Sequence, residues 1–149
     1  MKFFLPLVMF LAVFTFSNCD DDDTTLMTID SSLPSNFTAD RTGSLTAENS
    51  TPTTGSVELG MDEDNRTFLR LGSDFTTEQA TGTVTVYLST SEVFTPSPMT
   101  GNPDLILVGA LNTNGAQDFE ISQTVPATFT HVILWCATAN IPFGNALLQ

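Results

Sequence analysis

The chain has 149 residues, enough for one domain, and carries a formal net charge of −13 from 17 acidic and four basic residues. Binding to nucleic-acid phosphates needs clustered lysine or arginine, so this balance excludes a nucleic-acid-binding protein. Two cysteines and one histidine are too few for a disulfide scaffold or a zinc ribbon.

A secretory signal peptide is expected over residues 1–18. Met1 and Lys2 form a short basic start, and residues 3–16 are an apolar run interrupted only by Pro6 and Thr15. As a helix this run would span about 21 Å, which is short of the roughly 30 Å hydrocarbon core of a bilayer. It therefore indicates the hydrophobic region of a signal peptide rather than a membrane span.

Cys19 lies where a bacterial lipoprotein signal has its acylated cysteine, and four aspartates follow it at residues 20–23. Phe16 and Asn18 depart from the usual leucine and small residue before that cysteine. The acidic run resembles the tract after the lipid cysteine in some Gram-negative surface lipoproteins. We expect lipidation of Cys19 and a place in the cell envelope, anchored to the outer membrane or cell surface. The alternative is an ordinary secreted protein.

Residues 19–42 are predicted to be a tether between this lipid and the folded domain. The part over residues 24–42 is rich in Ser, Thr, Asp and Asn, with at most one short strand at residues 26–30. Removal of residues 1–18 leaves three arginines against 17 carboxylates, a net charge of −14. Such a charge favours solubility outside the cell and disfavours anionic partners.

Over residues 43–149, short apolar runs with a period of two alternate with turn residues, which indicates β-strands. Residues 62–65 separate two of the runs, and Asn114-Gly115 within residues 112–115 is the clearest hairpin signal. Eight short strands are predicted, at residues 44–47, 55–59, 67–71, 83–88, 105–109, 118–121, 131–137 and 141–147. We expect an all-β fold, either an antiparallel β-sandwich or a small barrel.

Several stretches carry a family resemblance. They are residues 108–111 (VGAL), 114–121 (NGAQDFEI), 131–136 (HVILWC) and 141–147 (IPFGNAL), with residues 55–57 (GSV), 74–75 (DF) and 86–88 (VYL) upstream. In this order they resemble the DM13 domain, a small extracellular β domain described as an electron-transfer module. Residues 82–85 and Phe119 depart from its pattern. The resemblance implies a β fold, an extracytoplasmic location and one characteristic cysteine, which corresponds to Cys136.

Cys136 is the candidate redox residue. If Cys19 is lipidated, Cys136 is the remaining thiol in an oxidising compartment, where thiols are uncommon. It would cycle through a sulfenic acid or a mixed disulfide with a redox partner protein. Trp135 could shield or tune this thiol. The alternative is a surface binding or structural module in which Cys136 is a buried core residue.

His131 is the obvious candidate base for Cys136, but it lies five residues away along one predicted strand. Since successive side chains of a strand point to opposite faces, His131 should face away from Cys136, which shares its face with Val132 and Leu134. Only a β-bulge or a return of the chain would bring the two together.

No cofactor and no metal site are expected. A blue-copper site takes two histidines and a cysteine, and an iron–sulfur cluster takes about four cysteines, so the chain has too few ligands for either. Haem held by His131 with Met61 or Met99 is arithmetically possible, but nothing in the sequence places these residues together. Without an acid–base pair, the protein is expected to be at most a redox accessory rather than an enzyme.

Overall fold

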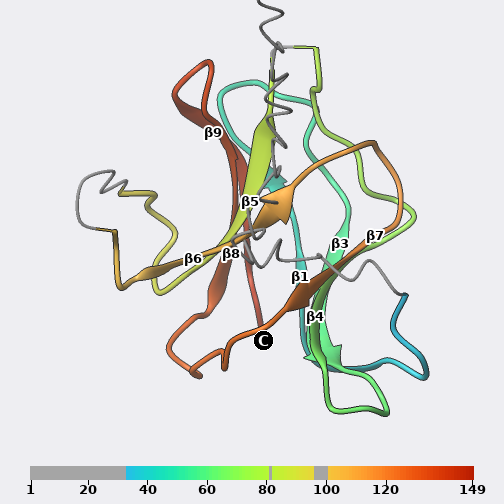
Figure 1. Cartoon of the computed structure of the whole chain (residues 1–149). Helices are drawn as coiled ribbons and strands as arrows, with labels where there is room; N and C mark the ends of the chain where they lie inside the picture. Colours follow the sequence, from blue (N-terminus) through green and yellow to red (C-terminus); the bar gives the residue numbers. More distant parts are fainter. Residues whose placement is uncertain (1–32, 81, 96–100) are drawn as a thin grey trace, which may run out of the picture.

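The computed structural model describes residues 33–80, 82–95 and 101–149 (Figure 1). The predicted signal peptide, Cys19, most of the tether and the predicted strand at residues 26–30 lie outside these residues. The described part is all-β, with nine strands in two antiparallel sheets, which confirms the predicted β-sandwich. No helix in this part is long and apolar enough to cross a membrane.

The two sheets are interleaved along the chain. Sheet A has the order β1-β3-β4-β7, with β1 at Thr38–Ser44, β3 at Ser56–Met61, β4 at Thr67–Leu71 and β7 at Gln117–Ile121. Sheet B has the order β2-β9-β8-β5-β6, with β2 at Thr46–Ala47, β9 at Ile141–Leu147, β8 at His131–Cys136, β5 at Val84–Ser89 and β6 at Leu105–Ala110.

The core lies between the sheets and follows from the alternation of each strand. Every second residue of the central strands is apolar and fully or almost fully buried. These residues are Val57 and Leu59 of β3, Leu69 and Leu71 of β4, Val84, Val86 and Leu88 of β5, and Val132, Leu134 and Cys136 of β8. The chain thus buries a continuous apolar layer of the kind that stabilises a sandwich of this size.

The folded domain begins before the predicted residue 43, because β1 of sheet A includes Thr38–Thr42 of the expected tether. This strand is paired with β3 and contains no large apolar residue, so its sequence has no hydrophobic alternation. Two backbone hydrogen bonds also join β1 to the last residue of the chain. The N–H of Thr42 donates to the carbonyl of Gln149 at 2.8 Å, and the N–H of Gln149 donates back at 2.9 Å.

The two turn signals have different outcomes. Residues 62–65 form the hairpin between β3 and β4, as expected. The predicted hairpin at residues 112–115 is wrong, because β6 pairs with β5 and β7 pairs with β4, so this loop crosses from one sheet to the other. Gly115, with φ of 90°, keeps the turn chemistry, but its N–H donates to the carbonyl of Phe75 at 2.8 Å.

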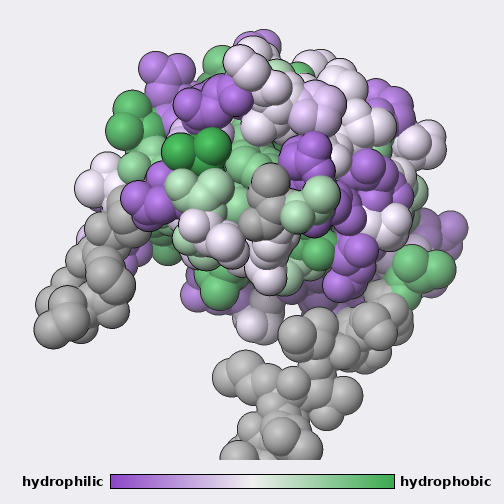
Figure 2. All heavy atoms as spheres, turned by 90° about the horizontal axis from the view of Figure 1, so that it is seen from above, coloured by the Kyte–Doolittle hydropathy of each residue, from purple (hydrophilic) through white to green (hydrophobic). Residues whose placement is uncertain are grey.

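The surface is mixed in character. Hydrophilic residues are spread between smaller hydrophobic areas on the face shown in Figure 2. The exposed large hydrophobic residues of the described part are Leu33, Met61, Val93, Leu107 and Leu147. Single exposed apolar residues are ordinary in soluble proteins. Only an exposed apolar residue on an unpaired edge strand calls for an explanation.

Candidate functional site

Cys136 lies at the end of β8 on the inner face of sheet B and is 0% exposed. It stands opposite Val84 of β5 and Ile141 of β9, within the apolar layer between the sheets. The chain then enters the exposed turn at residues 137–140, and the N–H of Asn140 donates to the carbonyl of Cys136 at 2.8 Å. The residue is therefore buried in the resting structure but directly adjoins a surface turn.

Trp135 projects from the opposite face of sheet B. Its ring stacks on Phe94 with ring centroids 4.1 Å apart, and Phe94 meets the ring of Tyr87 edge-on at 4.9 Å. This aromatic cluster, Tyr87, Phe94 and Trp135, covers the outer face of the sheet, where Ile133 is only 1% exposed. Trp135 therefore shields the outside of the sheet rather than the thiol. No local sequence pattern predicts that Phe94, in a loop, contacts the Trp135 ring.

His131 lies at the other end of β8 from Cys136 and on the other face. The register of β8 with β5 is unbroken from His131 to Cys136, so the predicted opposition of the two side chains is confirmed. The irregularity of the β8–β9 pair falls on β9, where Phe143 is the additional residue. Nδ1 of His131 lies 3.0 Å from the hydroxyl oxygen of Thr130. The candidate base and the thiol are separated by about 16 Å of strand.

The described residues offer no assembled metal site. No group of three or more His, Cys, Asp or Glu side chains in this part of the chain is placed to hold a metal ion. Of the residues considered for haem, Met61 lies at the end of β3 in sheet A and His131 begins β8 in sheet B. Met99 lies outside the described residues.

The turn between β3 and β4 holds a charged cluster instead of a cation site. Asp62 is almost fully buried, and its carboxylate accepts hydrogen bonds from the N–H groups of Asp64 and Arg66, both at 3.0 Å. The guanidinium of Arg66 adds two more, at 2.9 and 2.6 Å, and lies 3.6 Å from Glu120 of β7. Both carboxylate oxygens of Asp62 are thus engaged by groups of the hairpin itself.

Burial alone would raise the pKa of Asp62, but the hydrogen bonds and charge of Arg66 outweigh it and hold that pKa below its usual range. A lowered pKa means that the ionised carboxylate stabilises the fold at pH values above the ordinary aspartate pKa of about 3.9. This contribution is lost as the pH falls through the lower pKa of the folded state.

We expect Asp62→Asn to make the free energy of unfolding depend less on pH in the acid range. At pH 6 the variant should be clearly less stable than the parent, and the gap should narrow as the pH is lowered toward 3, because the parent then loses its carboxylate interactions. Urea unfolding at a series of pH values measures this. Asp64→Asn, an exposed change in the same turn, is the matched control. A gap that stays constant with pH would contradict the assignment.

Several residues that carry the family resemblance have packing roles. The N–H and hydroxyl of Ser56 donate to Asp74, with the hydroxyl at 2.8 Å. At Gly109, a Cβ would lie 2.7 Å from the ring of Phe119. At Gly144, a Cβ would lie 2.7 Å from the carbonyl oxygen of Thr46. These positions fix how closely neighbouring segments of the chain approach one another.

Comparison with known proteins agrees with this reading of the motifs. A family model described as "Electron transfer DM13" matches residues 44–148, from the end of β1 through β9. No curated protein and no solved structure matches the chain. The match covers most of the sequence and each of the stretches discussed above. The chain therefore belongs to the DM13 family of electron-transfer domains.

Proposed function

We propose that the protein is an exported, lipid-anchored electron-transfer accessory, not an enzyme, whose redox group is the Cys136 thiol. The observation that carries the proposal is the position of Cys136. It is the only cysteine among the described residues, it belongs to a stretch that matches the DM13 family, and it adjoins the exposed turn at residues 137–140. The proposed anchor is a lipid on Cys19, which the run of four aspartates at residues 20–23 follows.

The proposed chemistry is thiol–disulfide exchange. The Cys136 thiolate attacks one sulfur of a disulfide in a partner protein, so that a Cys136–partner S–S bond forms, the partner's S–S bond breaks and its second sulfur leaves as a thiolate. A dithiol carrier then attacks the mixed disulfide with one thiolate and restores the Cys136 thiol, and its second thiolate displaces the first partner. Two electrons pass from the carrier to the disulfide in total.

Because Cys136 is 0% exposed, this exchange needs a local opening of the sheet. The end of the β8–β9 hairpin is the natural place, since strand ends and exposed turns open at lower free energy than the core. The four residues of the turn are all exposed, so its opening would uncover little apolar surface.

The second candidate is a surface binding or structural module in which Cys136 is only a core residue. The complete burial of Cys136 favours it, as do the positions of Trp135 and His131 on the other face of sheet B. A reactive thiol needs access and a neighbour that stabilises the thiolate. Neither Trp135 nor His131 supplies this in the resting structure.

Alkylation of Cys136 in increasing urea distinguishes the two candidates. On the redox proposal, the folded protein should react at least about a hundredfold more slowly than the unfolded chain, yet the rate should change little at low urea. Local opening exposes little surface, and the dependence on urea scales with the surface exposed. The measurement uses protein with Cys19→Ser, so that one thiol reacts, and mass spectrometry as the readout.

The matched control moves the thiol along the same strand. Val132, which is 0% exposed and faces the same core, becomes the reporter in Val132→Cys with Cys136→Ser. Its alkylation should require global unfolding and should rise steeply with urea. If Cys136 in the parent behaves in the same way as this control, no local opening serves it and the core-residue candidate is correct.

A further inference from the structure

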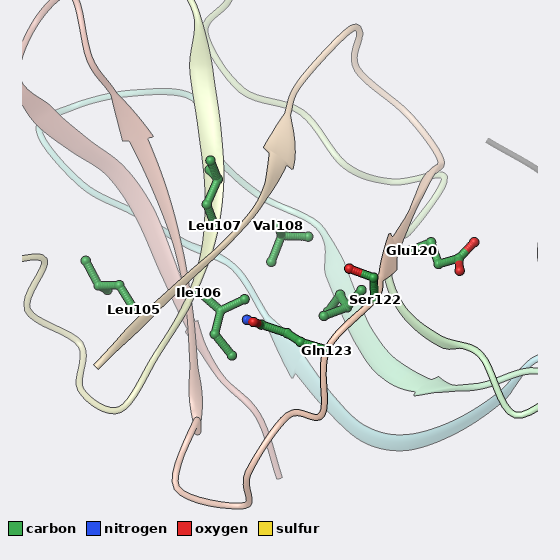
Figure 3. Close-up of a pocket in the computed structure, with 8 residues that line it drawn as sticks. Leu105, Ile106, Leu107, Val108, Glu120, Ser122 and Gln123 are labelled. Atoms are coloured by element: carbon green, nitrogen blue, oxygen red, sulfur yellow. The ribbon is translucent and has the colours of Figure 1, made fainter. Parts of the chain in front are cut away.

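β6 forms one edge of sheet B. β6 pairs with β5 on one side, and no strand among the described residues lies on its other side. A groove of about 410 Å³ separates it from β7, the edge strand of sheet A, and is lined by Leu105, Ile106, Leu107, Val108, Glu120, Ile121, Ser122 and Gln123. In Figure 3, Ile106 and Val108 face Gln123 across this space, while Glu120 points away.

Two hydrogen bonds show which backbone groups of β6 face the groove side. The N–H of Thr90 donates to the carbonyl of Asp104 at 3.1 Å, and the N–H of Leu111 donates to the carbonyl of Val84 at 2.9 Å. In an antiparallel pair, alternate residues direct their N–H and C=O to the neighbouring strand. Counting from Asp104, the backbone N–H and C=O of Ile106 are directed to β5, and those of Leu107 are directed away from β5. Leu107 therefore directs its N–H and C=O to the open edge.

Apart from a register irregularity at Val108, β6 has none of the sequence features that protect an edge strand. Its sequence, LILVGA, has no charge and no proline, and the side chain of Leu107 is 62% exposed. Proteins ordinarily guard an exposed edge with lysine, proline or a covering segment, because a bare edge is a template for another strand. The register irregularity at Val108 bends the strand but leaves residues 105–107 extended. This edge has the form of a strand-addition site.

The charge of the molecule indicates what kind of strand would bind. The described residues contain no lysine, and their three arginines contact the chain's own acceptors: Arg41 the carbonyl of Phe129, Arg66 Asp62, and Arg70 Asp118. Exposed Asp104 directly precedes β6. A second copy of this chain, with a net charge of −13, would be repelled, whereas a basic segment would be attracted.

We propose that the open edge of β6 binds an extended, basic segment of another protein, which adds to sheet B as a further strand. Backbone bonds to Leu107 would hold the segment, and every second side chain would enter the groove against Ile106, Val108 and Ile121. Apolar residues suit those positions, and lysine or arginine suits the ends of the segment. The site does not involve Cys136, so it stands or falls independently of the redox proposal.

The test uses a synthetic nine-residue peptide of alternating valine and threonine with lysine at both ends, titrated into ¹⁵N-labelled protein. The expected result is saturable shifts of amide signals at residues 105–110 and 122–123, and slower hydrogen exchange at Leu107. Leu107→Pro removes the N–H that faces the edge and should weaken binding at least about tenfold. Leu107→Thr, which keeps that N–H, is the matched control and should bind nearly as the parent does.

A second pair of probes tests the charge argument. The same peptide with glutamate at both ends should bind at least about tenfold more weakly at low salt, and the difference should shrink as salt is added. Three outcomes would overturn the proposal: no saturable shift, shifts located at β2 or elsewhere outside the residues that line the groove, or equal binding of both peptides. Shifts at β6 that grow with protein concentration alone would overturn it in favour of pairing between copies. Thermal unfolding of each variant verifies that it is folded.

Discussion

Replacement of Phe75 by alanine is expected to lower the free energy of unfolding by about 3–5 kcal/mol. Phe75 is 0% exposed and is among the largest fully buried side chains of the described part. It lies between β4 and β5, in a turn where its N–H donates to the carbonyl of Gly72 at 3.0 Å. Its carbonyl accepts the N–H of Gly115, so the loop between the sheets also depends on its position. Urea unfolding measures the loss.

The surroundings of Phe75 leave little room to collapse around a cavity. A Cβ on Gly55 would lie only 2.6 Å from its Cα, which shows how closely the two backbones already approach. Phe75→Leu keeps most of the apolar volume and is the matched control, with a clearly smaller loss expected. A loss below about 1 kcal/mol for Phe75→Ala would show that the site relaxes and that the core does not depend on this ring.

Gly109→Val is expected to destabilise the domain by about 1–3 kcal/mol through overpacking. A Cβ at this position would lie 2.7 Å from Cδ1 and 3.0 Å from Cε1 of Phe119, and valine adds two further carbons. The ring of Phe119 reaches across from β7 and packs against the core, so it cannot move aside at no cost. The free energy of unfolding of the purified variant gives the magnitude.

Phe119→Ala in the same chain separates this clash from other effects of valine. If the ring is the obstacle, Gly109→Val should cost much less in the Phe119→Ala background than in the parent, which gives a large coupling energy in the double-mutant cycle. Strictly additive losses would mean that valine at residue 109 acts through the backbone of β6 instead.

Strands that are short apolar runs bounded by turn residues could be predicted closely from the sequence. The predicted strands at residues 67–71 and 141–147 have the same bounds as β4 and β9. β1 could not be found in this way, because its sequence, TADRTGS, is polar and its pairing comes from the neighbouring β3. The turn at residues 112–115 shows the related limit. Asn-Gly predicts a reversal of the chain, but not which strand follows on which sheet.

The candidate site shows the same division between local and long-range information. The opposite faces of His131 and Cys136 follow from strand parity alone, and the structure confirms them. The stacking of Phe94 on Trp135 depends on how a loop folds back over sheet B, which no local pattern encodes. The groove beside β6 likewise exists only because β6 and β7, consecutive in the chain, end two different sheets.

The family motifs themselves gain a physical explanation. Asp74, Gly109 and Gly144 each satisfy a close approach or a hydrogen bond between neighbouring segments. A resemblance built on such residues identifies the fold, because each of them is required by how its strands and loops meet.

The pairing of β2 with β9 has a consequence for how the chain folds. Thr46 and Ala47 stand opposite Asn145 and Gly144, so strands from the two ends of the domain must meet before sheet B is complete. The described part contains no helix, and closing such long loops is entropically costly, so we place folding in the millisecond-to-second range typical of sandwiches. A chain that has not yet reached residues 141–147 cannot form the β2–β9 pair, so sheet B is completed only after the last strand of the domain is present.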